Sequence, residues 1–158
     1  MANSATAMED VTIAPATVED VPTIQSMVHA AYSKYIERMG QPPAPMNANY
    51  HEILATHEVH VLKANGDTVG SIVLGTKGDS VQINNLVVGP TAQGRGYGRI
   101  LMAHAEETAR QRGCTALTLY TNVKMYENLA LYRKMRFEEI DRRTEDGYER
   151  VFFRKEIK

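Results

Sequence analysis

A strand that changes face halfway along its length, followed at once by three closely spaced glycines, limits the fold of this 158-residue chain more than any other segment. Val81 and Ile83 share one face of the predicted strand, whereas Leu86 and Val88 follow the opposite phase, with Asn84-Asn85 between them. One extra residue in a strand reverses the facing of every residue after it. The pattern therefore predicts a β-bulge in the middle of this strand.

The order of the predicted elements indicates an α+β fold with a mixed, mostly antiparallel sheet. Alternating apolar residues and turn signals, with Asn65-Gly66 as the strongest hairpin signal, predict six to seven strands. These are Val11–Ala14, Glu58–Ala64, Thr68–Gly75, Val81–Val88, Ala116–Tyr120, Phe137–Arg142 and Arg150–Ile157. About four helices flank them, and these run from a Thr17 cap to about Glu37, over Asn49–Thr56, from Gly98 to Arg112, and over Lys124–Met135. We expect residues 1–9 to form a flexible tail and residues 10–158 to form one domain.

Composition excludes several classes of protein. Apolar residues make up 43% and charged residues 23% of the chain, which is typical of a globular domain. The one cysteine, Cys114, cannot form an internal disulfide, and this suits a reducing compartment. The absence of long apolar runs and of a signal-peptide pattern predicts a cytoplasmic protein with no membrane partner. A net charge of −1 argues against a nucleic-acid partner.

The glycine segment, Gln93–Arg99, indicates an anion site. It stands where a strand gives way to a helix, and its glycines allow close approach of a ligand to the backbone. Helix N-termini favour acidic residues, yet the first acid of this helix is Glu106, while Arg95 and Arg99 lie at its start. A bound phosphate or pyrophosphate explains this reversal. The alternative is a glycine-rich surface turn with solvated arginines.

Two common phosphate-binding motifs do not match. A P-loop ends in Gly-Lys-Ser/Thr, whereas Gly98 is followed by Arg99-Ile100. A dinucleotide fold requires G-x-G-x-x-G and an acidic residue about twenty positions later. Here the spacing is G-x-G-x-G, and the next strand ends in Tyr120-Thr-Asn.

The spacing Gln93-x-x-Gly96-x-Gly98 instead resembles the Q/R-x-x-G-x-G/A signature of the GNAT superfamily of N-acetyltransferases. The resemblance extends to the preceding strand, Asn85–Pro90, and to Glu127–Phe137 downstream. It implies a single-domain GNAT fold and acetyl-CoA as co-substrate.

The resemblance also implies roles for particular residues. The backbone of the bulged strand would pair with the pantetheine arm, and the glycine segment would hold the pyrophosphate. Asn128 would lie near the thiol end, and Tyr132 matches the tyrosine that protonates the departing thiolate. The cofactor-binding residues expected in this way are Leu86, Val87, Val88, Gln93, Gly94, Arg95, Gly96, Tyr97, Gly98, Arg99 and Asn128. Periodicity alone favours a core position for Tyr132.

The sequence departs from the family pattern at two positions. Arg136 replaces the glycine of the common Y-x-K-x-G-F motif, and Met125 replaces the asparagine seven residues before the tyrosine. No general base is evident, because Tyr120 occupies the position of the glutamate that some relatives carry. His51, His57, Glu58 and His60 are available, and a water chain is an alternative.

The predicted activity is acetyl transfer from acetyl-CoA to a primary amine by direct attack in a ternary complex. The acceptor is a small-molecule or peptide amine, and its wall is expected at Tyr32, Tyr35, Arg38, the segment up to Tyr50 and the loop Thr144–Tyr148. No metal is implied, since no cluster has ligand spacing. Homodimerisation is compatible with the resemblance. The rival hypothesis is a non-catalytic acyl-CoA-binding sensor.

Overall fold

The computed structural model describes residues 10–157, so the predicted tail over residues 1–9 lies outside the described part of the chain. The strands are β1 Val11–Pro15, β2 Glu58–Ala64, β3 Asp67–Lys77, β4 Ser80–Val88, β5 Ala116–Asn122, β6 Glu138–Glu145 and β7 Tyr148–Glu156. The α-helices are α2 Val21–Tyr32, α3 Tyr35–Met39, α4 Tyr50–Thr56, α5 Tyr97–Gln111 and α6 Tyr126–Lys134, and two 3-10 turns are η1 Val18–Asp20 and η2 Ala44–Asn47.

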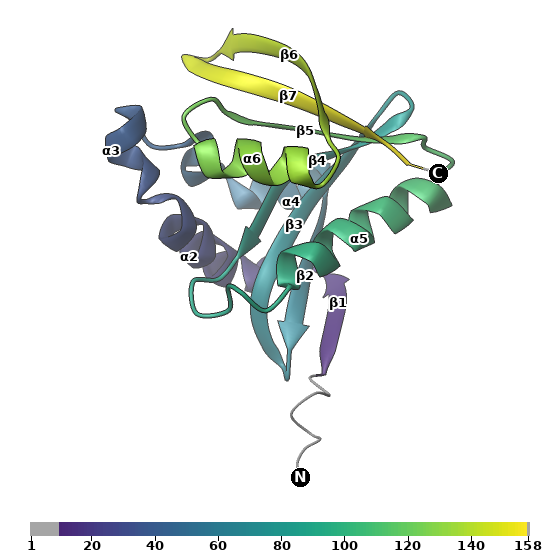
Figure 1. Ribbon diagram of the computed structural model, residues 1–158. Coiled ribbons are helices and arrows are strands. Elements are labelled where there is room, and N and C mark those ends of the chain that lie inside the picture. Colours follow the sequence, from purple (N-terminus) through teal and green to yellow (C-terminus); the bar gives the residue numbers. More distant parts are fainter. Residues whose placement is uncertain (1–9, 158) are drawn as a thin grey trace.

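All seven strands form one sheet in the order β1-β2-β3-β4-β5-β7-β6. Only β4 and β5 are parallel neighbours, and every other pair is antiparallel. Helices α5 and α6 cover one face of the sheet, and α2 and α4 cover the other (Figure 1). The predicted α+β fold with a mixed, mostly antiparallel sheet is confirmed.

Each face of the sheet has its own apolar core. Leu101 of α5 and Phe153 of β7 are fully buried in the first core, under α5 and α6. Ile24 and Val28 of α2 are buried in the second core, against β2, β3 and β4. Burying these side chains supplies the main driving force for folding. None of the helices in residues 10–157 is both long and apolar enough to cross a membrane.

The predicted single helix from the Thr17 cap to Glu37 is wrong beyond Tyr32. The Thr17 backbone N–H donates to Asp20 Oδ2 at 2.8 Å, as the cap predicts, but α2 ends at Tyr32. The Ser33 backbone N–H and the Ser33 hydroxyl both donate to the His29 carbonyl oxygen, and such a side-chain bond bends a helix. The chain turns at Ser33 and Lys34 before α3 begins.

The C-terminal hairpin is longer than the sequence indicates. The predicted strands stop at Arg142 and restart at Arg150, with a loop at Thr144–Tyr148, whereas β6 and β7 run to a two-residue turn. Asp146 and Gly147 form this turn with φ of 53° and 82°. These left-handed conformations suit Asp and Gly and match the twist of the strands. The predicted loop is therefore wrong.

Arg136 occupies a left-handed position just after α6, with φ of 73°. The Phe137 N–H donates to the Tyr132 carbonyl oxygen at 2.9 Å, as in a Schellman motif, which usually has glycine at this position. The strained arginine costs about 1 kcal/mol.

We expect Arg136→Gly to raise the unfolding midpoint by about 2–4 °C. Lys134→Gly, within α6, should lower it; equal midpoints for both variants in a thermal melt would contradict this explanation.

A histidine pair joins β2 to α5. The rings of His60 and His104 meet edge-on with centroids 4.7 Å apart, and neither His60 Nδ1 nor His104 Nε2 has a hydrogen-bond partner. Burial lowers the pKa of His104 below the ordinary 6.5, and His60 lowers it further, while Glu58 opposes the shift. The folded protein therefore binds this proton less tightly than the unfolded chain.

This difference predicts a pH-dependent stability. The contribution of neutral His104 is fully present above the unfolded pKa of 6.5 and is lost as pH falls through the folded pKa. We expect the unfolding midpoint to fall between about pH 7 and pH 5, and His104→Gln to flatten that fall. The exposed His51 on α4 supplies the control, His51→Gln. An unfolding midpoint that falls with pH as steeply in His104→Gln as in the wild-type protein would refute the assignment to His104.

Candidate active site

The predicted β-bulge is confirmed, and it opens the sheet. Val73 of β3 pairs with Asn85, whereas Leu74 pairs with Ile83, so Asn84 is the extra residue. Parallel pairing between β4 and β5 ends at the same point, with Ile83 opposite Leu119. Beyond it β4 no longer pairs with β5, and Asn84, Asn85 and Leu86 line a cavity.

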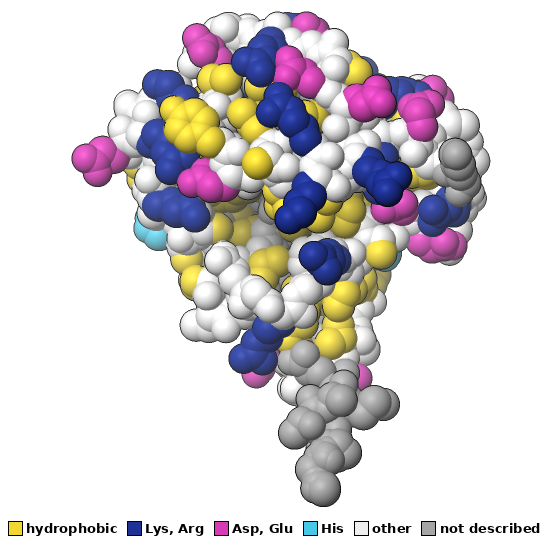
Figure 2. Space-filling view, in the orientation of Figure 1, with side chains coloured by type: hydrophobic (Ala, Val, Ile, Leu, Met, Phe, Trp, Pro, Cys, Tyr) yellow, Lys and Arg dark blue, Asp and Glu magenta, His cyan; other side chains and the backbone are white. Residues whose placement is uncertain are grey.

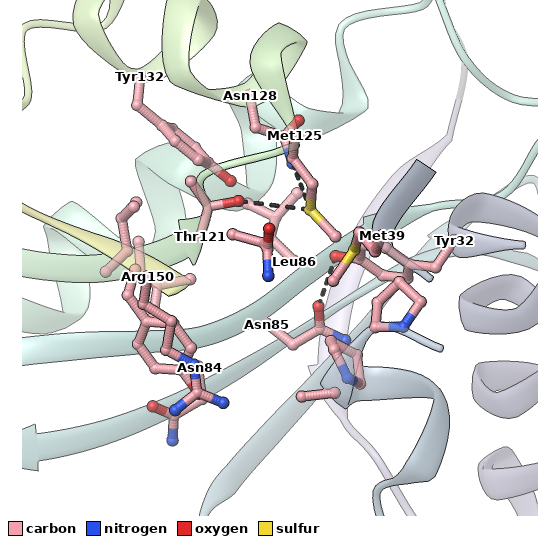
Figure 3. A pocket seen from close by; sticks show the side chains of 17 residues that line it. Tyr32, Met39, Asn84, Asn85, Leu86, Thr121, Met125, Asn128, Tyr132 and Arg150 are labelled. Carbon is pink, nitrogen blue, oxygen red and sulfur yellow. Dashed lines mark hydrogen bonds between the residues drawn. The ribbon is translucent and has the colours of Figure 1, made fainter. Parts of the chain in front are cut away.

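This cavity, called the main cavity because the predicted residues of β4 and α6 line it, has a volume of about 70 Å³ and lies between the separated strands, α6 and the segment before α4 (Figure 3). Its described lining residues come from seven parts of the chain: Tyr32, Met39, Pro43, Ala44, Pro45, Ile83, Asn84, Asn85, Leu86, Leu119, Tyr120, Thr121, Asn122, Met125, Asn128, Tyr132 and Arg150. The structure thus brings together the bulged strand and both predicted residues of α6.

Tyr132 directs its hydroxyl into the main cavity (Figure 3). Its ring packs against Phe137 and Phe153, each with centroids 5.9 Å away, so the side chain is firmly positioned. Burial raises the pKa of Tyr132 to about 12, and the nearby Tyr35 adds to the shift. At neutral pH the phenol is therefore protonated and able to donate a proton.

Asn128 lines the same cavity one helical turn before Tyr132. Its Nδ2 donates to the Met125 sulfur at 3.6 Å, and the Thr121 hydroxyl donates to the same sulfur at 3.5 Å. Met125, which stands where the family pattern has asparagine, is buried, so its side chain contributes to packing. Besides Tyr132, α6 presents the polar side chain of Asn128 to the cavity.

The glycine segment follows β4 directly and begins α5. Gly94 and Gly96 have φ of 84° and 83°, conformations that favour glycine, and Gly96 is the N-cap. The first turn of α5 contains no acidic residue. The Gln93 amide donates to the Val88 carbonyl oxygen at 3.5 Å, which ties the segment to the end of β4. Backbone N–H groups at such a helix start favour anions.

Basic side chains border the entrance to this region. Figure 2 shows Lys and Arg side chains around the hollow between α6 and the first turn of α5.

Of the strand residues expected to contact cofactor, Leu86 and Val88 pack on the first core, whereas Val87 is buried in the second core. Val87 can therefore contribute only its backbone to a ligand in the cavity.

A partly buried series of hydrogen bonds fixes the opposite wall. The Tyr32 hydroxyl donates to Asn85 Oδ1 at 3.0 Å, and Asn85 Nδ2 donates to the Tyr50 hydroxyl at 3.3 Å. The Tyr50 hydroxyl in turn lies 3.5 Å from the Pro45 carbonyl oxygen. Burial raises the pKa of Tyr32 far above its ordinary value and that of Tyr50 to about 12. These hydrogen bonds join α2 and the η2 segment to the bulged strand.

An adjoining cavity of about 470 Å³ lies on the α4 side of β4 and shares Asn84, Asn85 and Tyr120 with the main cavity. His57 lines it, and His57 Nδ1 lies 2.8 Å from the Thr56 hydroxyl. That hydroxyl donates to the Glu52 carbonyl oxygen, so its lone pair is left to accept from the imidazole.

The other three base candidates line neither cavity. Glu58 pairs with Arg112, His60 packs on His104, and His51 is exposed on α4. Of the four, the structure brings only His57 near the bulge.

Two contacts hold together the wall that was predicted to bind the acceptor. Arg38 forms a two-pronged ion pair with Glu127 at 2.9 and 3.1 Å, joining α3 to α6, and this pairing lowers the pKa of Glu127 to about 2. The Tyr148 hydroxyl donates to the Pro42 carbonyl oxygen at 2.7 Å. The β6–β7 turn thus contacts the proline segment, although it is not an open loop. Tyr35 is buried beside these contacts.

Sequence reasoning missed Arg150, which lines the main cavity. Val151 and Phe153 point into the first core, so alternation along β7 directs Arg150 to the opposite face. Its position at the cavity depends on the pairing of Arg150 with Asn122 of β5. That register joins segments far apart in the sequence, and no local signal reveals it.

Comparison with known proteins decides the family. The model of the "Acetyltransferase (GNAT) family" matches residues 24–137, which is most of the chain. The protein belongs to the GNAT acetyltransferase family. The predicted membership is confirmed, and the GNAT domain includes the bulged strand, the glycine segment and α6.

Individual relatives agree with this assignment. A protein described as "IAA acetyltransferase" from Azospirillum brasilense is 38% identical over 79 residues. The match covers 49% of this chain and 52% of the relative, so the chain spans about half of that relative's length.

Solved GNAT structures share the fold. The "IAA acetyltransferase from Bacillus cereus ATCC 14579" has a TM-score of 0.69 at 23% identity, over 94% of this chain and 100% of that one. A GNAT family acetyltransferase from Elizabethkingia anophelis with acetyl-CoA bound has a TM-score of 0.73 at 20% identity, over 93% and 98% of the two chains.

The described residues also bear on metal binding. Within residues 10–157, no three His, Cys, Asp or Glu side chains gather as metal ligands would.

Proposed function

We propose that this GNAT protein transfers the acetyl group of acetyl-CoA to a primary amine of a small molecule or peptide. The amine attacks the thioester directly while both substrates are bound. The observation that carries the proposal is the cavity at the bulge, where unpaired β4 backbone and Tyr132 meet. The glycine segment begins at the same end of β4.

The residues at this end of β4 fit a CoA thioester. The β4 backbone beyond Ile83 is free of β5 and can hydrogen-bond an amide-containing arm, as an added strand would. Gly94 and Gly96 bring the first N–H groups of α5 to where a pyrophosphate would lie, with Arg95 and Arg99 beside them. When bound, acetyl-CoA supplies an acetyl group already activated as a thioester.

The chain's own groups then divide the proton transfers. Backbone N–H groups near Leu86 stabilise negative charge on the thioester oxygen. Tyr132, held protonated by burial, donates its proton to the departing sulfur. No acidic residue is among the described residues of either cavity, and His57 lines only the adjoining one, so we propose that a water chain removes the proton from the attacking ammonium.

The proposal is tested by incubating the protein with acetyl-CoA and a panel of amines. Release of free CoA thiol should depend on an amine, and the amine should gain one acetyl group by mass spectrometry. Thiol release that is equal with and without every amine would contradict acetyl transfer.

A further inference from the structure

Arg150 is the one charged side chain among the described residues of the main cavity. Its side chain is only 11% exposed. Its guanidinium lies over the Tyr120 ring at 4.5 Å and near the Tyr148 ring at 5.5 Å, so it is held in place by aromatic packing. A charge kept this far from water requires a compensating partner.

The partner that the structure shows is partly exposed and makes a single hydrogen bond. Arg150 Nη1 donates to Glu145 Oε1 at 3.0 Å, and Glu145 is 37% exposed. Arg143 lies 3.6 Å from Glu145 but has a closer partner in Asp141 at 2.9 Å. A guanidinium carries five N–H donors in a flat fork, and this bond uses one of them. Arg150 therefore keeps N–H donors for a second carboxylate in the cavity.

The other lining residues narrow the chemistry further. None of the described residues of either cavity is Asp or Glu, so an acceptor with several positive charges would find no carboxylate there. Met39, Pro43, Pro45 and Met125 give the main cavity an apolar wall. These surroundings suit a molecule with one amine, one carboxylate and an apolar body.

We propose that the acceptor is such an amino-acid-like amine and that Arg150 binds its carboxylate. The inference rests on the proposed acetyl transfer, and it names the substrate class for the same site. In the view of Figure 3 the Arg150 side chain extends toward Asn84, away from Asn128 and Met125. An acceptor held by Arg150 would thus enter from the side of the bulge where the two cavities meet.

Matched acceptors test the proposal. Phenylalanine and phenylalaninamide share the side chain and differ at the carboxylate, which also changes the pKa of the amine. Expressed per concentration of neutral amine, we expect the wild-type protein to prefer phenylalanine. Arg150→Gln should raise KM for phenylalanine about 10- to 100-fold and leave KM for the amide within twofold. Arg150→Lys should give an intermediate loss, because a lysine keeps the charge without the fork. Arg143→Gln, which also contacts Glu145 but does not line the main cavity, is the control.

A binding measurement separates this inference from the proposed function. Calorimetry on the CoA-loaded protein should show binding of 3-phenylpropanoate, weaker binding of 3-phenylpropanamide, and loss of the difference in Arg150→Gln. A thermal melt with CoA confirms that each variant folds. Equal binding of acid and amide, or an equal loss of both in Arg150→Gln, would overturn the inference even if amines are acetylated. Carboxylate-selective binding without any acetyl transfer would keep Arg150 as a carboxylate site but refute both the proposed function and the role of the ligand as acceptor.

Discussion

Tyr132→Phe should lower kcat for acetyl transfer by about 100-fold or more while the Kd for CoA stays within twofold of wild type. The phenol points into the main cavity, and its pKa, raised to about 12, keeps the proton in place. The ring contacts with Phe137 and Phe153 do not involve the hydroxyl, so the variant should fold with an unchanged melting temperature. The measurements are steady-state kinetics and calorimetric titration with CoA.

Tyr126→Phe is the matched control, because Tyr126 lies on the same helix, is 60% exposed and does not line the cavity. It should leave kcat unchanged. Full activity in Tyr132→Phe would assign proton donation to another group or to water. A wild-type protein that binds CoA but acetylates no amine would instead support the acyl-CoA sensor.

Replacing both Arg95 and Arg99 with Gln should raise the Kd for CoA about 100-fold or more. Each charge-assisted contact with phosphate contributes about 1.5–3 kcal/mol, and the two arginines stand at the start of α5, where no acidic residue competes with an anion. Affinity should be measured by calorimetry at fixed ionic strength, since screening weakens such contacts.

Two controls make this result specific. Acetyl-pantetheine has no pyrophosphate, so its affinity should be the same in the double variant and in wild type. Arg110→Gln, at the far end of α5, should leave CoA binding unchanged. An equal loss of affinity for both ligands would indicate a general structural change and contradict a pyrophosphate site in the glycine segment.

Local patterns in the sequence predicted the elements that build this site. The phase slip between Ile83 and Leu86 is caused by one extra residue, and the structure places that residue at Asn84. The glycines and the absence of early acids at the start of α5 are likewise local. Such features are readable because side-chain alternation and helix-end chemistry depend on neighbouring residues.

Features that depend on distant pairing were missed or misplaced. Arg150 reaches the cavity only through the register of β7 on β5, and β6 extends to Glu145 by pairing with β7 although its exposed residues after Ile140 show no apolar alternation. The apolar periodicity continues through Tyr35 although the helix is interrupted at Ser33 and Lys34, so it did not reveal the break between α2 and α3. Tertiary context decides these points, and local propensity does not.

Thermal unfolding with acetyl-CoA, CoA and NADH side by side tests the central claim, that the cavity and the glycine segment bind CoA. At a hundredfold excess over its Kd a ligand adds about 2.7 kcal/mol, which raises the midpoint by several degrees in a protein of this size. The account predicts a rise with acetyl-CoA and CoA and none with NADH. Unchanged midpoints at saturating CoA, or a rise with NADH alone, would contradict it.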